Sequence, residues 1–472
     1  MREDLADTIC AIATASGEGG VGIVRLSGPD ALSIAGRVVR LRSGQSLAHV
    51  SSHMLYLADL VLPSTVGANE DHGLSQKGVT FDEAMIVYMK APGSFTAEDV
   101  VEVHSHGGPV VLGLLCEACV LAGARMAAPG EFTKRAFLNG RLDLSQAEAV
   151  LDTIRAKSVI GLRMAQRHLR GELAQKIEVA RSVLLRVLAH VEAGIDFVEE
   201  DITFVQREEL EQAIEKAAAV IGKLEATARD GRMLREGVRV VIVGRPNVGK
   251  SSLMNRLLNQ ERAIVTPIPG TTRDVIEESI DLNGILVRFV DTAGIREATD
   301  PVEQEGIKRT QSAQADADLL LVVIDGHVRL TDEDRQILKT VAGLPYLIVF
   351  NKGDLTRAVE SSDLPSGAER IVISAKTGLG LEELKVAIRG RLVSPGFEVN
   401  EALVVTNVRH RTALRRAQDS LTHASESVRM QLAGELVAMD LRVAADALGE
   451  ITGAITTDEI LEKVFAEFCI GK

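Results

Sequence analysis

Aromatic residues are the scarcest component of this sequence. Phe, Tyr and Trp together make up 3% of the 472 residues and Trp is absent, so the hydrophobic cores must be aliphatic. Hydrophobic residues still account for 46% of the chain. At roughly 100–200 residues per domain, we expect two to four domains, each with its own core.

Long hydrophobic runs are also missing. Apolar stretches such as Leu319–Ile324 are much shorter than the ~20 residues that a membrane-spanning helix needs. The N-terminus, MREDLADTIC, is acidic and has no apolar segment, which argues against a signal peptide. The four cysteines are widely scattered. We therefore expect a cytoplasmic protein with reduced thiols and no membrane anchor.

Positive charge is in short supply. The chain has 53 Lys and Arg against 66 Asp and Glu, a net charge of −13, which excludes a general nucleic-acid binder. Any contact with RNA must come from local basic stretches. Residues 154–176 hold six basic residues against one acid, Glu172, and residues 409–416 hold four Arg. Each stretch is either an RNA-binding face or a solvated helix face, the usual role of such runs.

Changes in the hydrophobic pattern divide the chain into four segments. Short apolar strands predict a mixed α/β domain over residues 1–120, and helical periodicity predicts long helices over residues 121–236. Strands alternate with helical stretches over residues 237–393, which predicts a doubly wound parallel sheet. The helical pattern returns over residues 394–472. The predicted fold is α/β plus α, with a nucleotide-binding domain inserted into one helical domain.

The elements that we expect from these patterns follow from the sequence alone. A helix is predicted to start near Ser145 as N-cap, with Glu148 three residues later. The expected strands are 8–13, 21–26, 83–88, 99–104, 238–243, 286–290, 319–324, 346–350 and 371–373.

A phosphate-binding loop is the first chemical motif. Residues 244–251 read GRPNVGKS, with a predicted strand before them and a predicted helix, 252–258, after them. Glycine lets backbone N–H groups turn inward around phosphates, and the helix N-terminus adds partial positive charge. Lys250 would then reach the β- and γ-phosphates, and the Ser251 hydroxyl would bind Mg²⁺.

Later loops indicate which nucleotide binds. NKGD ends at Asp354 after a predicted strand, and this carboxylate can accept hydrogen bonds from guanine N1–H and the 2-amino group, a pair that adenine lacks. SAK at 374–376 follows the next strand and suits guanine O6, while DTAG at 291–294 suits the γ-phosphate. Thr272 is the expected second Mg²⁺ ligand. These motifs, in this order, predict a GTP-binding domain.

The expected nucleotide site can be given in full. Lys250, Asp291 and Gly294 would also act in catalysis. The residues expected around GTP are Asn247, Val248, Gly249, Lys250, Ser251, Ser252, Thr266, Pro267, Ile268, Pro269, Gly270, Thr271, Thr272, Asp291, Thr292, Ala293, Gly294, Asn351, Lys352, Asp354, Ser374, Ala375 and Lys376.

One position suggests how hydrolysis is catalysed. Ile295 follows DTAG where Ras-type GTPases have a Gln, and Ile cannot orient water. Asn247 offers an amide oxygen beside the phosphates that can bind a monovalent cation. One unit charge at ~4 Å contributes roughly 4 kcal/mol at an effective dielectric of about 20, which is about a thousandfold in rate. We therefore expect hydrolysis to depend on potassium.

The motifs also resemble a known family. GRPNVGKSS from Gly244, PGTTRD from Pro269 and DTAGIRE from Asp291 resemble the TrmE-Era-EngA-like branch of P-loop GTPases. Within this branch the resemblance is to the MnmE (TrmE) family of tRNA-modification GTPases and covers nearly the whole chain. The stretches that carry it are GGVGIVR at 19–25, EDVVE at 98–102, PGEFTKRAFLNGRLD at 129–143 and FCIGK at 468–472.

The resemblance implies a fold and a reaction. The N-terminal domain would be a folate-binding-like α+β domain that forms a constitutive homodimer, and the G domain would be Ras-like. With the FAD-dependent protein MnmG, in a heterotetramer or larger complex, the enzyme would modify C5 of the wobble uridine of certain tRNAs. The product would carry an aminomethyl or carboxymethylaminomethyl group. The one-carbon unit would come from 5-formyl- or methylene-tetrahydrofolate.

Further site residues are implied by the resemblance alone. Glu303 would be a catalytic carboxylate acting through a bridging water, although its place in the sequence suggests only a solvated acid. Lys472 reaches the N-terminal domain only if the C-terminus docks there, which we expect to happen across the dimer. The implied folate-binding residues are Arg25, Glu102, Arg141 (often Lys in the family) and Lys472, and the implied potassium ligands are Asn247, Thr266, Ile268 and Thr271.

The cysteines have alternative interpretations. The resemblance implies a catalytic role for Cys469, but a thiol packed beside Phe465 and Phe468 is an equal alternative, and Lys is a poor last residue for a prenylation box. Cys116 and Cys119 lie in an apolar helical stretch and are either a redox or metal pair or, as we favour, buried small residues.

Two histidines have either a packing or a catalytic role. His104 and His106 precede Gly107 at a predicted strand-to-helix turn, where we favour packing over catalysis.

A ribosome-assembly switch of the Era or Der type is the alternative function. A KH domain or basic tail would then follow the G domain, whereas this tail is predicted to be helical and ends in CIGK. We therefore favour a tRNA-modifying GTPase.

Overall fold

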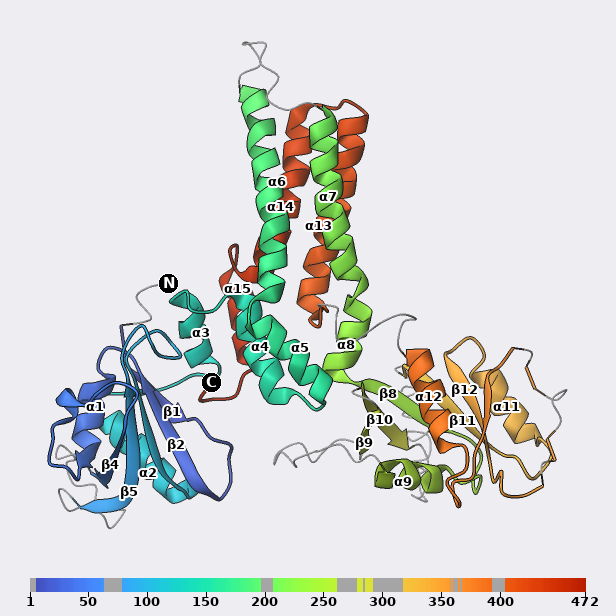
Figure 1. The fold of residues 1–472 in the computed structure, drawn as a ribbon, viewed down its shortest axis with the longest axis horizontal. Helices are drawn as coiled ribbons and strands as arrows, with labels where there is room; N and C mark the ends of the chain where they lie inside the picture. The colour runs from blue at the N-terminus through green and yellow to red at the C-terminus, as the bar shows by residue number, and fades with distance from the viewer. Residues whose placement is uncertain are drawn as a thin grey trace, which may run out of the picture. The chain divides into compact units, whose positions relative to one another are not determined.

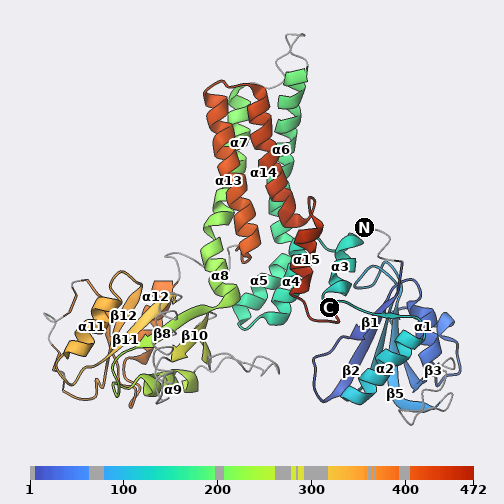
Figure 2. The ribbon, with the colours of Figure 1, turned by 180° about the vertical axis from the view of Figure 1, so that it is seen from behind.

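The computed structural model describes most of the chain, in two compact units. The described residues are 6–62, 79–196, 207–260, 278–282, 285–291, 317–356, 358–359, 364–365, 367–392 and 404–472. One unit comprises Met1–Leu151 with Gly449–Lys472, and the other comprises Asp152–Leu448 (Figures 1 and 2). No helix among the described residues is long and apolar enough to cross a membrane.

The first unit is built on a seven-stranded mixed sheet in the order β3-β4-β5-β6-β2-β1-β7. The strands are β1 (Ile9–Ile12), β2 (Gly19–Ser27), β3 (Val39–Leu41), β4 (Leu55–Val61), β5 (Thr80–Met89), β6 (Val100–Gly107) and β7 (Arg125–Met126). The predictions of β1, β2, β5 and β6 are confirmed. The short strands β3 and β7 and the strand β4 were not predicted.

Two helices pack on one face of this sheet. α1 (Ala31–Val38) and α2 (Pro109–Leu121) bury aliphatic side chains against alternate residues of the strands, such as Val24, Ala84 and Val103. Because side chains alternate along a strand, the intervening residues lie on the opposite face. That face carries Arg25 and Glu102.

The unit extends beyond the boundary at residue 120 that the sequence pattern suggested. β7 pairs with β1 in parallel, so the sheet itself continues to Met126. The unit also includes α3 (Glu131–Leu138), most of α4 (Leu144–Arg155) and, from the C-terminal end of the sequence, α15 (Asp458–Ala466). Leu144 of α4 packs in one cluster with Phe465 of α15. The hydrophobic pattern changes where long helices begin, whereas the unit boundary depends on contacts between distant segments.

The start of α4 also differs from the prediction. Asp143, rather than Ser145, precedes the first helical residue, and its Oδ1 accepts hydrogen bonds from the Gln146 amide and the Ser145 hydroxyl. The Gln146 side chain accepts from the Asp143 amide in return at 2.9 Å. This is a reciprocal capping box one helical turn long.

Among the described residues, the second unit contains six helices, some long and some short, that lie outside the G domain in the sequence. They are α5 (Val159–Leu169), α6 (Glu172–Asp196), α7 (Arg207–Ala226), α8 (Ala228–Glu236), α13 (Val408–Arg429) and α14 (Gly434–Thr452). Both views show α6, α7, α13 and α14 side by side. Buried residues at helical spacing, including Ile214 and Ile221 of α7 and Leu414 and Leu421 of α13, form the seam. Helices from before and after the G domain therefore pack together, as predicted for an inserted domain.

The G domain has a six-stranded sheet in the order β13-β12-β11-β8-β10-β9. Its elements are β8 (Val238–Val243), α9 (Lys250–Gln260), β9 (Glu278–Leu282), β10 (Ile285–Asp291), β11 (Leu319–Asp325), α11 (Asp332–Thr340), β12 (Tyr346–Asn351), β13 (Arg370–Val372) and α12 (Leu381–Leu392). Every described pair is parallel except the edge pair β9–β10. Hydrophobic clusters lie on both faces of the sheet, with α9 and α12 on one and α11 on the other. The doubly wound prediction is confirmed.

Candidate functional site

The phosphate-binding loop joins β8 to α9 and depends on two glycines. Gly244 has φ +157° and Gly249 has φ +97°. A Cβ on Gly244 would collide with the Val323 carbonyl oxygen, and one on Gly249 would collide with the Asn351 side chain. Asn247, at φ +61°, is exposed within the loop, in the left-handed conformation that Asn tolerates better than most residues.

Lys250 holds this loop from within. Its Nζ donates to the carbonyl oxygens of Gly244, at 2.8 Å, and Arg245, at 2.9 Å. The side chain is 9% exposed. An ammonium group fixed against the loop backbone, at the N-terminus of α9, provides positive charge where an anionic phosphate would bind.

Asn351 ties the phosphate loop to the expected base site. Its Nδ2 donates to the Val248 carbonyl at 2.8 Å, and its Oδ1 accepts from the Ala375 amide at 2.9 Å. Ser374 donates its hydroxyl to Asp354 Oδ1 at 2.6 Å. This hydrogen bond holds the pKa of Asp354 below its usual value, so the carboxylate is ionised and can accept two N–H groups from a guanine edge.

Asp325, at the end of β11, contacts the candidate site and was not predicted from the sequence. Its Oδ2 lies 2.5 Å from Lys352 Nζ, and Lys352 adopts a left-handed backbone at φ +64°. Burial alone would raise the pKa of Asp325, but the bond and charge of Lys352 outweigh burial and lower it. The ion pair therefore fixes the NKGD loop. The sequence does mark this position, because Asp325 is an acidic residue at the end of the apolar run Leu319–Ile324.

Several predicted nucleotide-site residues lie outside the described residues. Asp291 is described at the end of β10, without its side chain. The residues on which the structure gives nothing are Thr266, Pro267, Ile268, Pro269, Gly270, Thr271, Thr272, Thr292, Ala293, Gly294, Ile295 and Glu303. Their roles stay predictions.

A second candidate site lies on the sheet of the first unit. Arg25 of β2 and Glu102 of β6 are directly opposite each other in the strand register. Arg25 donates to Glu102 Oε1 through Nε, at 2.8 Å, and Nη2 lies 2.8 Å from the same oxygen. The other oxygen, Oε2, lies 3.2 Å from His104 Nε2. Arg25 therefore holds one oxygen of Glu102 and His104 contacts the other, so the carboxylate is fixed in orientation.

Two phenylalanines organise the guanidinium groups of this site. Arg25 lies between the rings of Phe95 and Phe132, at 5.7 and 5.6 Å from their centroids. Arg141 lies 5.2 Å from the Phe95 ring and donates to the Phe95 carbonyl at 2.6 Å. Phe95 thus brings Arg25 and Arg141 together by cation–π contacts.

A buried network holds the loop that carries Phe95. Ser27 Oγ contacts both Thr96 Oγ1 and Glu98 Oε2 at 2.7 Å. The side chain of Arg135, only 1% exposed, lies between Glu98, Glu131 and Asp7, with its closest contact to Asp7 Oδ1 at 2.6 Å. None of these residues was predicted as part of a site, because most of these contacts join residues 37 to 128 positions apart, which local sequence patterns do not reveal.

The C-terminal residues reach the same place. Burial lowers the pKa of Lys472, the nearby charge of Arg25 lowers it further, and Glu102 opposes both. Gly471, at φ +95°, packs against the backbone of Ile12. The structure therefore brings together all four residues expected at a folate site. Docking occurs within one chain, so the expectation that it happens across a dimer is wrong, because residues after α15 are close enough to reach their own sheet.

The structure shows the environment of the three cysteines considered above. Cys469 is exposed while Phe465 and Phe468 pack together, so a packed Cys469 thiol is wrong. Cys116 and Cys119 are buried in α2, and burial raises the pKa of Cys116 to about 12 and that of Cys119 well above its usual value. The preferred reading of the pair as buried small residues is confirmed, and the described residues contain no metal-binding cluster.

His104 and His106 both lie on β6, immediately before the turn into α2, as predicted. His106 Nδ1 lies 2.7 Å from Asp82 Oδ1 on the neighbouring strand, which is a structural contact. His104 contacts Glu102 and so belongs to the candidate site.

Comparisons with known proteins agree with this arrangement. A family model described as "MnmE helical domain" matches residues 144–469, more than half of the chain, and one described as "GTP-binding protein TrmE N-terminus" matches residues 8–141. The first match encloses the G domain.

Full-length relatives are similarly close. The "tRNA modification GTPase MnmE" of Geobacter sulfurreducens is 47% identical over 467 residues, which cover 99% of both chains. The protein of the same name from Heliobacterium modesticaldum is 47% identical over 477 residues, 99% of this chain and 100% of that one. The one from Clostridioides difficile is 42% identical over 469 residues, 99% of both chains. The chain therefore belongs to the MnmE (TrmE) family of tRNA-modification GTPases.

Proposed function

We propose that this chain is a cytoplasmic, potassium-dependent GTPase that modifies C5 of the wobble uridine of certain tRNAs, using a one-carbon unit from a tetrahydrofolate. It acts with an FAD-dependent partner of the MnmG type, in a heterotetramer or larger complex, to add an aminomethyl or carboxymethylaminomethyl group. The observation that carries the proposal is that Arg25, Glu102, Arg141 and Lys472 lie close together in the structure. These residues come from four distant parts of the sequence.

The chemistry of this cluster suits a folate. A pterin edge offers several N–H donors, and the Glu102 carboxylate, which has more acceptor sites than its contacts with Arg25 and His104 use, is an appropriate acceptor. Three basic side chains, Arg25, Arg141 and Lys472, surround one carboxylate side chain, which favours the anionic glutamate tail. Phe95 supplies an apolar surface beside them. When bound, the folate would supply the one-carbon unit, and the residues of the cluster would orient it.

The G domain suits Mg²⁺–GTP. Asp354, supported by Ser374, accepts the guanine edge, and Lys250 lies against the phosphate loop. Ser251, with Thr272, would bind Mg²⁺, whose charge would stabilise the phosphates. Asn247, exposed in the loop, would offer its amide oxygen to potassium, together with Thr266, Ile268 and Thr271. Glu303 would position the attacking water.

A homodimer is proposed from exposed apolar side chains on one face of the N-terminal sheet. Leu55 and Leu57 of β4 are 53% and 42% exposed, and Met85 of β5, opposite Leu57 in the register, is 38% exposed. They lie on the sheet face opposite the two helices, beside the row that contains Arg25 and Glu102. An exposed apolar patch of this kind is typical of an interface, and we propose that a second copy of the chain covers it.

The test separates the two sites. Calorimetry with 5-formyl-tetrahydrofolate is expected to show binding to the full-length wild-type protein and none to Glu102→Ala, while both hydrolyse GTP at the same rate. A nucleoside profile of tRNA from a strain that expresses Glu102→Ala in place of the wild type should lack the C5 modification. Folate binding by Glu102→Ala at wild-type affinity would place the site elsewhere, and an unchanged nucleoside profile would refute the role in modification.

A further inference from the structure

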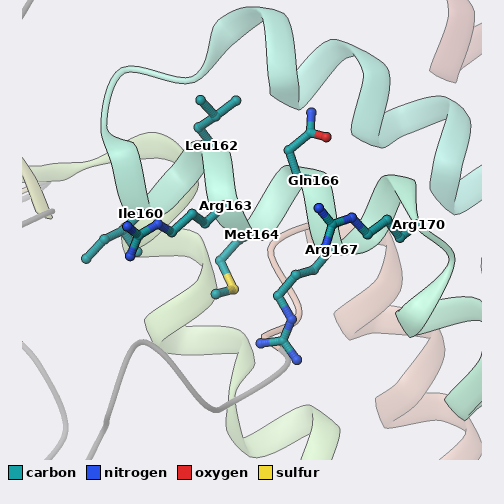
Figure 3. Close-up of a pocket in the computed structure, with 7 residues that line it drawn as sticks. All are labelled: Ile160, Leu162, Arg163, Met164, Gln166, Arg167 and Arg170. Atoms are coloured by element: carbon teal, nitrogen blue, oxygen red, sulfur yellow. The ribbon is translucent and has the colours of Figure 1, made fainter.

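A basic pocket lies on α5, and none of its lining residues belongs to either site described above. It has a volume of about 350 Å³ and is lined by Ile160, Leu162, Arg163, Met164, Gln166, Arg167 and Arg170 (Figure 3). Arg163, Arg167 and Arg170 are spaced by four and three residues, so they follow one side of the helix. At 1.5 Å per residue they span roughly 10 Å along its axis. We call these three residues the α5 arginine face.

The α5 arginine face is partly organised by the protein itself. Arg167 Nε donates to Glu172 Oε2 at 2.8 Å, which orients the side chain. Arg163 and Arg170 are exposed. The α5 arginine face is thus a local concentration of basic side chains in a chain whose net charge is −13. The apolar side chains of Ile160 and Met164 contribute to the lining.

The fold brings the second basic stretch of the sequence to the same end of the helical bundle. His168 Nε2 lies 2.8 Å from the Val404 carbonyl, and the Val405 amide donates to Thr227 Oγ1 at 3.1 Å. Asn407 then caps α13, so Arg409 and Arg411 follow in its first turn. The two basic stretches, far apart in the sequence, thus lie near the same end of the bundle. A helix face that only contacts solvent would not need a second basic stretch close to it.

We propose that the α5 arginine face binds the phosphodiester backbone of the RNA substrate. The proposal rests on the proposed function, in which that substrate is a tRNA. Arg guanidinium groups bind phosphate bidentately and also stack on unpaired bases. A pocket bordered by guanidinium planes, aliphatic carbon and the Gln166 amide therefore suits one unstacked nucleotide of a tRNA loop. In an acidic chain, such a local patch supplies the attraction that the overall charge opposes.

Binding of an unmodified tRNA transcript tests the proposal. The full-length variant Arg163→Gln/Arg170→Gln should bind at least about tenfold more weakly at low salt than the wild type, because phosphate contacts supply most of the affinity. The slope of log K against log salt should become shallower by roughly 1.4 to 1.8, the value for two lost phosphate contacts. Arg163→Lys/Arg170→Lys should keep the slope and lose only part of the affinity.

A matched control removes two positive charges elsewhere in the same bundle. Arg186 of α6 and Lys216 of α7 are exposed, and Arg186→Gln/Lys216→Gln should change neither the affinity nor the slope by more than a small fraction of the test effect. GTP hydrolysis without tRNA and the thermal unfolding curve report whether each variant is folded, and both should match the wild type.

Three outcomes overturn the proposal. One is equal affinity and slope for the test variant and the wild type, and another is an equal loss in the control. The third is normal tRNA binding with lost binding of the FAD-dependent partner, which would make the face a protein-docking surface. Failure of the proposed function is distinguished by other measurements, namely normal folate binding or an unchanged tRNA nucleoside profile for Glu102→Ala.

Discussion

Removal of Arg135 should destabilise the N-terminal unit far more than removal of its neighbour Arg125. Both arginines contact Asp7 and Glu131. The side chain of Arg135 is 1% exposed, whereas that of Arg125 is 49% exposed. Breaking a buried pair by deleting one partner costs about 3–5 kcal/mol. Here Glu98 and Glu131, each only 13% exposed, would lose the buried counter-charge of Arg135. Breaking an exposed pair costs about 0–1 kcal/mol.

The expected shift in melting temperature follows from the size of the unit. For a domain of 150–250 residues, 1 kcal/mol moves the melting temperature by roughly 2–4 °C. Arg135→Met should therefore lower the transition of the N-terminal unit by roughly 6–20 °C, and Arg125→Met by a few degrees at most. Differential scanning calorimetry of the full-length variants measures both. Equal shifts for the two variants would refute the burial argument.

The difference between the variants should depend on pH. Burial would raise the pKa values of Asp7 and Glu131, but hydrogen bonds and charge from the two arginines outweigh it, so both pKa values are lowered. A carboxyl group with a lowered folded-state pKa stabilises the fold above its unfolded pKa and loses that contribution as pH falls through the folded pKa. The wild type should therefore lose its advantage over Arg135→Met below about pH 4. An advantage that persists through that range would contradict the assignment.

Three further predictions concern the G domain. Asp354→Asn should lose GTP and prefer xanthosine triphosphate in competition binding, because a carboxamide N–H₂ faces the donors of guanine but matches the 2-carbonyl of xanthine; an unchanged preference for GTP contradicts this role. Turnover in KCl should exceed turnover in NaCl at equal ionic strength, because Ile295 cannot orient water and Asn247 offers a cation ligand; equal rates would remove the cation from the mechanism. Glu303→Ala should lower kcat and leave KM near normal, since a group acting on the attacking water contributes little to ground-state binding; a raised KM with normal kcat would indicate a structural acid.

The G domain could be predicted largely from the sequence because its signals are local. Strands β8, β11 and β12 are buried apolar runs that end directly in GRPNVGKS, Asp325 and NKGD. β9 was missed because it is an edge strand whose sequence, ESIDL, alternates polar and apolar residues without a flanking motif. Local composition determines a central strand, whereas an edge strand depends on the partner beside it.

The residues of the proposed folate site could be predicted only in part. Arg25 and Glu102 were expected there from the family resemblance, but their direct pairing depends on the register between β2 and β6. Phe95 and Arg135 were missed because their roles come from contacts with Arg141, Glu98 and Asp7 across long sequence separations. Sequence patterns identify side chains of the right chemistry, and tertiary packing decides which of them meet.

The C-terminal segment provides a final test of this site. Gly471 has φ +95°, and a Cβ there would collide with the Ile12 carbonyl oxygen. A non-glycine residue pays about 1–2 kcal/mol for such a backbone even without a collision, so Gly471→Ala should displace Lys472 from Arg25 and Glu102. Folate affinity should fall about tenfold, which corresponds to about 1.4 kcal/mol, with GTP hydrolysis unchanged. Gly44→Ala is the matched control, because Gly44 has φ +74° in the same unit with no atom within 4 Å of the added Cβ. If the two variants bind 5-formyl-tetrahydrofolate equally well, Lys472 is not part of the site.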